Sequence, residues 1–171
     1  MATLIKNRRI IADSWRLLEL GTDRALPEVP ATGDVIVPLA AWQARREALL
    51  LRTGRTGVWL DGNEAPEAIA GDVERFAVIA VNFPKASDGR GYSSARLLRE
   101  RYRFAAELRA IGDVQRDQLL FLERCGFDAY ALRDDQDAED ALRAFADFSE
   151  AYQTSATQPV PLFRRRTAAT S

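Results

Sequence analysis

Residues 76–83 (FAVIAVNF) constrain the fold more than any other part of this 171-residue chain. Seven of these eight residues are apolar, so the run fills both sets of alternating positions. A strand of this kind needs cover on both of its faces. Central strands of parallel sheets meet that need, because other elements pack on both sides of the sheet. The run therefore predicts an α/β fold built around a buried parallel strand.

Shorter apolar runs alternate with segments that are rich in helix-forming residues. The predicted strands are 35–38, 57–60, 76–83, 107–111 and 129–132, and the predicted helices are 39–53, 64–70, 93–103, 114–125 and 138–152. This alternation favours a mostly parallel sheet of about five βα units. We expect an open, doubly wound sheet. The alternative is a partial or half βα barrel, since five units are too few for a complete eight-unit barrel.

The two ends of the chain differ from this alternating part. Residues 1–33 hold a short apolar run at 9–12 and then a loop with Pro27, Pro30 and Gly33. They predict a small antiparallel β addition to the sheet. Residues 1–152 are expected to form a single α/β domain. Residues 153–171 are rich in Thr, Ala, Ser and Pro, contain Arg164-Arg165-Arg166, and predict a flexible tail.

Composition excludes several classes of site. The chain has no histidine and one cysteine, Cys125. A Ser-His-Asp triad, a Cys-His pair, a tetrahedral zinc site and an iron–sulfur cluster therefore cannot be built from this chain alone. Cys125 precedes Gly126 at the end of an apolar helix, which is typical of a packed, inert thiol. No metal site is expected.

The overall charge and hydropathy indicate the environment. The net charge is −1, which argues against nonspecific nucleic-acid binding. No apolar run is long enough for a membrane span, and charges interrupt the first fifteen residues, so we expect neither a membrane anchor nor a signal peptide. The single cysteine suits a reducing compartment, and the expected location is the cytoplasm.

The candidate site lies where the predicted strands end, because ligands of parallel α/β sheets bind beyond the carboxyl ends of the strands. The longest loop there follows residues 76–83 and contains Gly89 and Gly91 beside basic and hydroxyl side chains. Ser93 and Ser94 are expected at a helix start, where free N–H groups favour an anion. The predicted anion-binding residues are Lys85, Asp88, Arg90, Tyr92, Ser93, Ser94, Arg99, Arg109 and Asp113, with Asp61 as a further candidate.

Simpler interpretations stand beside this one. The sequence DGRG at 88–91 is also typical of an ordinary turn, in which Ser93 merely caps a helix. Arg109 lies within a predicted strand and needs a carboxylate partner if it is buried, for which Asp113 or Asp117 are candidates. Neither GxGxxG nor GxxxxGK[ST] is present, and no pattern identifies a catalytic residue or a cofactor.

Residues 83–102 (FPKASDGRGYSSARLLRERY) and 107–130 (ELRAIGDVQRDQLLFLERCGFDAY) resemble a bacterial family of unknown function. The resemblance covers about residues 35–148, with one departure at Ala86-Ser87, where a bulkier aromatic residue is expected first. Members are often labelled oxidoreductases and are encoded beside sulfite reductase and phosphoadenylyl-sulfate reductase. The resemblance therefore implies a role in assimilatory sulfite reduction, without implying catalytic residues.

Three functions follow as hypotheses. The first is an accessory protein that binds a small anion, or the surface of sulfite reductase or another sulfate-assimilation enzyme, through the basic loop. The second is an oxidoreductase that uses a flavin or nicotinamide cofactor. The third is a structural subunit of a homo- or hetero-oligomer, in which Leu- and Ala-rich helices pack against a second subunit.

Overall fold

The computed structural model describes residues 3–147, which form a curled, eight-stranded mixed sheet and four α-helices. The strands are β1 Thr3–Lys6, β2 Arg9–Ala12, β3 Arg16–Leu17, β4 Val35–Pro38, β5 Thr56–Leu60, β6 Val78–Phe83, β7 Glu107–Gly112 and β8 Ala129–Tyr130. The helices are α1 Leu39–Leu50, α2 Arg90–Arg96, α3 Leu119–Cys125 and α4 Ala138–Asp147. The predicted end of the last helix, at 148–152, and the predicted tail, at 153–171, lie outside the described residues.

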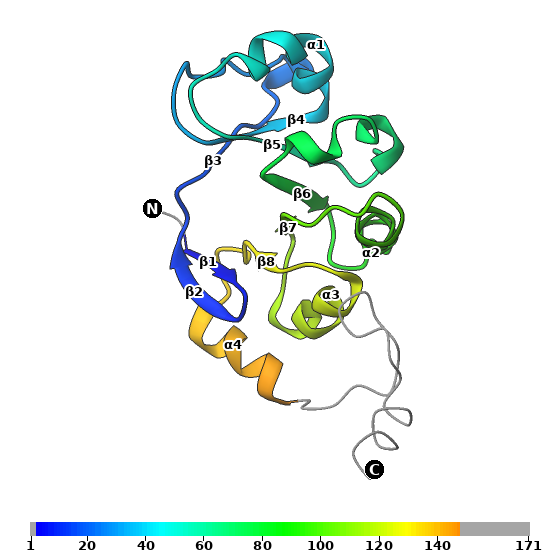
Figure 1. The fold of residues 1–171 in the computed structure, drawn as a ribbon. Coiled ribbons are helices and arrows are strands. Elements are labelled where there is room, and N and C mark those ends of the chain that lie inside the picture. The colour runs from blue at the N-terminus through cyan, green and yellow to red at the C-terminus, as the bar shows by residue number, and fades with distance from the viewer. Residues whose placement is uncertain (1–2, 148–171) are drawn as a thin grey trace, which may run out of the picture.

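The order of the strands decides the architecture. It runs β2-β1-β8-β7-β6-β5-β4-β3, so β3 to β8 lie side by side in chain order. Each of these neighbours pairs in parallel, whereas β1 pairs antiparallel with both β8 and β2. Figure 1 shows α1, α2 and α3 along one side of the sheet, with the chain from β2 to β3 passing along the other side.

The predicted doubly wound sheet is wrong, and the half-barrel alternative is confirmed. A doubly wound sheet needs a point where the strand order reverses, so that helices cover both faces. Here the order never reverses from β3 to β8, so successive right-handed crossovers place their helices on the same face. The sheet curls away from these helices, as in part of a barrel. The predicted N-terminal β addition is confirmed by β1 and β2.

The buried strand β6 has the two apolar faces that its sequence predicts. Ile79, Val81 and Phe83 point to the outer face and join the main core beneath the helices. Val78 and Ala80 point to the inner face, where they pack with Ile36, Ile111 and the tryptophans Trp15 and Trp59. Trp15 comes from the segment that joins β2 to β3. Part of the cover on the inner face is therefore supplied by the N-terminal chain rather than by a helix.

Several helix boundaries differ from the predicted ones. Helix α2 begins at Arg90 instead of Ser93, and a π-helical turn, Leu97–Arg101, continues it. The predicted helix at 64–70 is a 3-10 helix, Pro66–Ile69, and other single 3-10 turns lie at Thr22–Arg24, Val73–Arg75 and Arg116–Gln118. The predicted stop at Gly126 is confirmed, because this residue adopts a left-handed conformation with φ 113°.

Candidate functional site

The loop that follows β6 is held by carboxylates on its own side of the sheet. Asp88 accepts hydrogen bonds from Arg90 Nε at 2.9 Å and from Arg90 Nη2 at 2.6 Å. These bonds lower the pKa of Asp88 from 3.8 to about 2. Asp113 accepts from the Ala86 amide at 2.9 Å and from Arg133 Nη1 at 2.7 Å. The loop is thus fixed at both ends by side chains that the sequence had suggested for a ligand.

Asp61 lies next to this loop, and its carboxylate also accepts hydrogen bonds from within the fold. Its Oδ1 accepts from Asn82 Nδ2 at 2.8 Å and from the Gly62 amide at 2.8 Å. A Cβ placed on Gly62 would lie 3.0 Å from an Asp88 carboxylate oxygen, so the turn after β5 packs directly on the loop after β6. The carboxyl ends of β5, β6 and β7 therefore do bring Asp61, Asp88 and Asp113 to one edge.

The remaining candidate residues of the loop lie in the helix, contact neighbouring side chains or face solvent. The Tyr92 hydroxyl accepts a hydrogen bond from Gln118 Nε2 at 3.2 Å, and its ring contacts Phe83 and Phe121. Burial raises the pKa of Tyr92. Ser93 and Ser94 lie one turn inside α2, because the helix begins at Arg90. Lys85 is exposed to solvent.

Gly91 is required for packing. A Cβ at this position would lie 2.6 Å from the Phe83 ring, whereas a Cβ at Gly89 would contact nothing within 4 Å. The space beside Gly91 is therefore filled by a core side chain. Together with the paired Asp88 and Asp113, this favours the turn interpretation of the DGRG segment.

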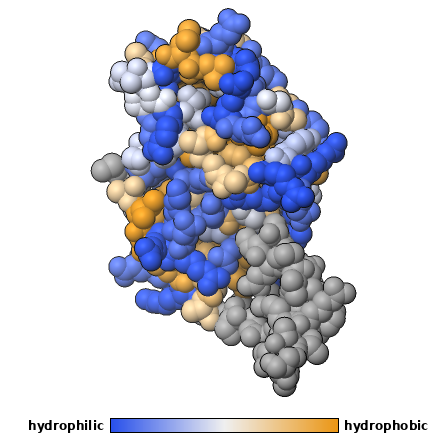
Figure 2. Space-filling view, in the orientation of Figure 1, coloured by the Kyte–Doolittle hydropathy of each residue, from blue (hydrophilic) through white to orange (hydrophobic). Residues whose placement is uncertain are grey.

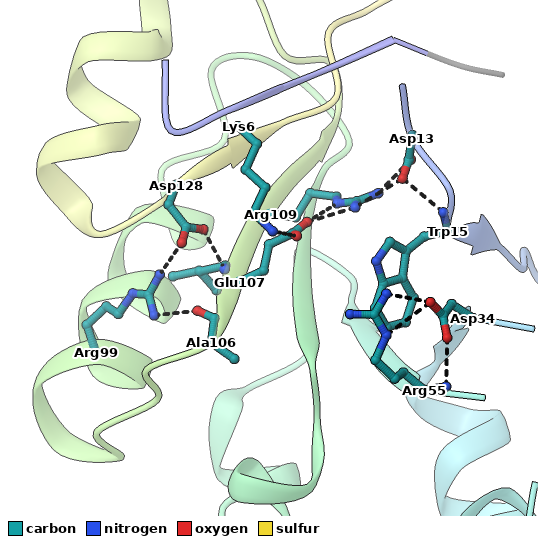
Figure 3. Close-up of polar contacts among 11 residues, drawn as sticks. Lys6, Asp13, Trp15, Asp34, Arg55, Arg99, Ala106, Glu107, Arg109 and Asp128 are labelled. Carbon is teal, nitrogen blue, oxygen red and sulfur yellow. Dashed lines mark hydrogen bonds and ion pairs between the residues drawn. The ribbon is translucent and has the colours of Figure 1, made fainter. Parts of the chain in front are cut away.

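Arg99 and Arg109, which the sequence grouped with the loop, lie elsewhere. Arg99 donates to the carbonyl oxygens of Gly126, Phe104 and Ala106 at 2.7–2.9 Å, and lies 3.4 Å from Asp128. It ties the π-helical turn to the start of β7, and burial lowers its pKa. This side chain joins loops at the amino-terminal end of the sheet, and Figure 3 shows its contacts with Ala106 and Asp128.

Arg109 lies on the inner face within a network of four charged side chains. Its Nη1 donates to Asp13 at 2.7 Å, and its Nε donates to Glu107 at 2.7 Å. The second oxygen of Glu107 accepts from Lys6 Nζ at 2.7 Å. The predicted ion pair of Arg109 is confirmed, but the predicted partners, Asp113 and Asp117, are wrong. They lie beyond the carboxyl end of β7, whereas Arg109 points across the sheet toward the N-terminal segment (Figure 3).

A cavity of about 350 Å³ opens beside this network. It is bounded by β1, by the segment 11–15 and by the amino-terminal halves of β6 and β7. Its charged lining residues are Lys6, Asp13, Arg55, Glu107 and Arg109. Arg55 bonds to Asp34 through Nε at 3.0 Å, and its guanidinium lies 4.8 Å from the centre of the Trp15 ring. Stacking on the indole holds this cation at the edge of the cavity.

Sequence reasoning missed Lys6, Asp13, Arg55 and Glu107. One signal was available, because Glu107 and Arg109 are two residues apart in an apolar strand and so share a face. Asp13 and Lys6 gave no such signal. They reach the cavity only through the path of the N-terminal chain, and Asp13 lies 96 residues from Arg109 in the sequence.

Cys125 is buried, as its position before Gly126 predicts, and burial raises the pKa of its thiol. Among residues 3–147, no three His, Cys, Asp or Glu side chains are grouped in a way that could hold a metal ion. In the same part of the chain, no helix combines the length and apolarity needed to cross a membrane.

Comparison with known proteins identifies the family but no individual relative. No match is found among curated proteins or among solved structures. One family profile matches residues 57–163, which is more than half of the chain and includes both segments that carry the resemblance stated above. The chain therefore belongs to the family described as bacterial protein of unknown function (DUF934).

Proposed function

We propose that this chain is a binding protein whose inner-face cavity holds a small oxyanion. The observation that carries the proposal is the convergence of three basic side chains from distant segments on one cavity. Lys6 comes from β1, Arg55 precedes β5, and Arg109 belongs to β7. The volume of about 350 Å³ is suited to a small ligand.

The charge of the lining favours an anion. Three cations and two carboxylates, Asp13 and Glu107, give a lining of net charge +1. Arg109 is neutralised by both carboxylates, so it serves mainly to order the site. Lys6 and Arg55 are the more exposed cations, with side chains 35% and 62% exposed, and each pairs with one carboxylate, Glu107 and Asp34 respectively. Charge-assisted hydrogen bonds from such groups are each worth about 1.5–3 kcal/mol when they are well formed.

The carboxyl-terminal edge supports anion binding less well. Asp61, Glu64, Asp88, Asp113 and Asp135 outnumber the cations Lys85, Arg90 and Arg133 at that edge. Arg90 and Arg133 are already bonded to carboxylates there. An oxyanion would have to displace a carboxylate from these cations, as it would from Arg55 and Lys6 on the inner face, so the excess of carboxylates is what sets this edge apart.

The resemblance to a family associated with sulfite reduction suggests which oxyanion to test. We propose sulfite or a chemically similar anion as the ligand, and an accessory role beside sulfite reductase or another sulfate-assimilation enzyme. Both cavity carboxylates accept hydrogen bonds from Arg109, and Glu107 also accepts one from Lys6. Groups engaged in this way are better suited to orienting cations than to transferring protons.

Calorimetric titration with sulfite, sulfate and phosphate tests the proposal, with two matched variants. Arg55→Gln and Arg90→Gln each remove an arginine whose side chain is 62% exposed and donates two hydrogen bonds to an aspartate. We expect Arg55→Gln to weaken binding about tenfold or more, because one charge-assisted bond is lost. Arg90→Gln, which lies outside the cavity, should bind like the wild type.

The other outcomes are equally informative. Loss of binding in Arg90→Gln alone would move the site to the loop after β6. Absence of binding to all three anions by the wild-type chain would overturn the proposal. A purified protein with the absorbance of a bound flavin would instead favour the oxidoreductase hypothesis, and co-purification with sulfite reductase would test the accessory role.

A further inference from the structure

The outer edge of β2 is an unused pairing surface among the described residues. Strand β2 pairs with β1 on one side, and all four of its residues are exposed. Ile10 and Ile11 are 39% and 38% exposed, although isoleucine is usually buried. Figure 2 shows hydrophobic surface over the part of the molecule where Figure 1 places β1 and β2. An exposed apolar edge of this kind is a template for a further strand.

The turn between β1 and β2 fixes which main-chain groups face outward. Asn7 and Arg8 form a two-residue turn with φ of 49° and 60°, and the register pairs Lys6 with Arg9 and Leu4 with Ile11. In such a hairpin the two residues that flank the turn donate to and accept from each other through their main chains. Along the strands, hydrogen-bonded pairs of this kind then alternate with pairs that are not hydrogen-bonded. Arg9 and Ile11 therefore bond to β1, whereas Ile10 and Ala12 point their N–H and C=O groups to the open edge.

We propose that β2 pairs in antiparallel fashion with β2 of a second copy of this chain, around a two-fold axis through Ile11. This register places Ile10 opposite Ala12 of the other copy, and Ala12 opposite Ile10 of the other copy. All four outward-facing residues of the two strands then form hydrogen-bonded pairs. A register centred on Ile10 would leave the groups of Ala12 without an equivalent partner in β2.

The side chains are self-complementary in this register. Arg9, Ile11 and Asp13 occupy alternating positions and so share the inner face. Ile11 packs against its own symmetry copy. Arg9 of one copy lies opposite Asp13 of the other, one residue past the end of β2. Within residues 3–147, the Arg9 side chain makes no hydrogen bond or ion pair, and Asp13 keeps a partly exposed carboxylate.

The pairing also connects with the cavity, because Ile11 and Asp13 line it. In the dimer, Arg9 of the second copy adds a cation near its rim. This last consequence rests on the proposed anion-binding function, whereas the dimer itself does not. Strands of four residues bury little surface, so we expect a weak dimer that forms as the concentration rises.

Disulfide trapping tests the register on the full-length chain. Opposed residues of a non-hydrogen-bonded antiparallel pair have Cα atoms about 4.5 Å apart, which a disulfide spans. We expect Ile11→Cys to form a covalent dimer on mild oxidation, about tenfold faster than Ile10→Cys. The two positions are equally exposed, and the native Cys125 is buried, so the second variant is a matched control. Equal rates for the two variants would overturn the proposed register.

Sedimentation equilibrium tests the dimer independently of any anion. The apparent mass of the wild-type chain should rise from that of a monomer toward that of a dimer as the concentration increases. Ile11→Lys should stay monomeric, because it places two like charges on the two-fold axis. Leu51→Lys alters a side chain that is 87% exposed and distant from β2, and it should dimerise like the wild type. A wild-type chain that stays monomeric throughout, or an Ile11→Lys variant that still dimerises, would refute the proposal even if anion binding is confirmed.

Discussion

Arginine–carboxylate pairs serve two regions of this molecule differently. At the carboxyl-terminal edge, Arg90 bonds to Asp88, two residues away in the sequence, and stays largely in solvent. On the inner face, Arg109 is buried and bonds to Asp13, which is 96 residues away, and to Glu107. The first pair shapes a turn. The second joins the N-terminal segment to the centre of the sheet.

The difference shows why a count of basic residues misleads. Residues 83–117 contain eight basic and five acidic side chains, which suggests one positive patch. In the fold, Arg90 pairs locally, Arg99 bonds to main-chain carbonyls, and Arg109 turns to the opposite face. Exposed pairs contribute little to stability because water competes for both partners, whereas a buried charge must be compensated. Burial, rather than number, distinguishes the two regions.

The largest expected effect comes from breaking the inner-face network. Replacing Arg109 by Met leaves Asp13 and Glu107 without their shared cation, and Glu107 is buried. Removing one partner of a buried ion pair costs about 3–5 kcal/mol. We expect a loss of that size in the free energy of unfolding, measured by urea denaturation. Arg90→Gln should leave this free energy nearly unchanged, and similar losses for the two variants would erase the contrast between the regions.

A smaller effect is expected from Gly91→Ala, which tests whether the DGRG segment is a packing feature. The added methyl group would overlap the Phe83 ring, which is buried. Overpacking of this kind costs about 1–3 kcal/mol. Gly89→Ala is the matched control, because nothing lies within 4 Å of its Cβ position. Thermal unfolding of both variants checks the prediction, and an unaffected Gly91→Ala protein would leave a ligand-binding role for Gly91 open.

The smallest expected effect is on acid titration at the carboxyl-terminal edge. Arg90 lowers the pKa of Asp88 from 3.8 to about 2. A carboxyl group whose pKa is lower in the folded state stabilises the fold above its ordinary pKa. That contribution is lost as the pH falls from about 4 to about 2. Carbon-13 NMR should show Asp88 titrating near 2, and at a higher pH in Arg90→Gln, which loses the side-chain hydrogen bonds but keeps the one from the amide of residue 90. A wild-type midpoint near 3.8 would mean that the pair does not persist in solution.

Much of the local structure was predictable because its causes are local. The apolar run at 76–83 fixed a buried strand with two covered faces, and Gly126 ended α3 through its left-handed conformation. The packed thiol of Cys125 and the N-terminal β addition followed from the same kind of pattern. Start positions were less well predicted. Ser93 resembled a helix cap, but α2 begins at Arg90, whose amide donates a hydrogen bond to the Asp88 carboxylate.

The sequence by itself determined the α/β class, the central strand and the absence of histidine chemistry. Only the tertiary structure decided the half-barrel and the inner-face cavity. Strand order depends on which strands pair, and several orders bury the same apolar surface equally well. Likewise, Lys6, Asp13, Arg55 and Arg109 meet only because the N-terminal chain crosses the inner face between β2 and β3. Contacts between segments so far apart are set by the path of the whole chain, and no local pattern records that path.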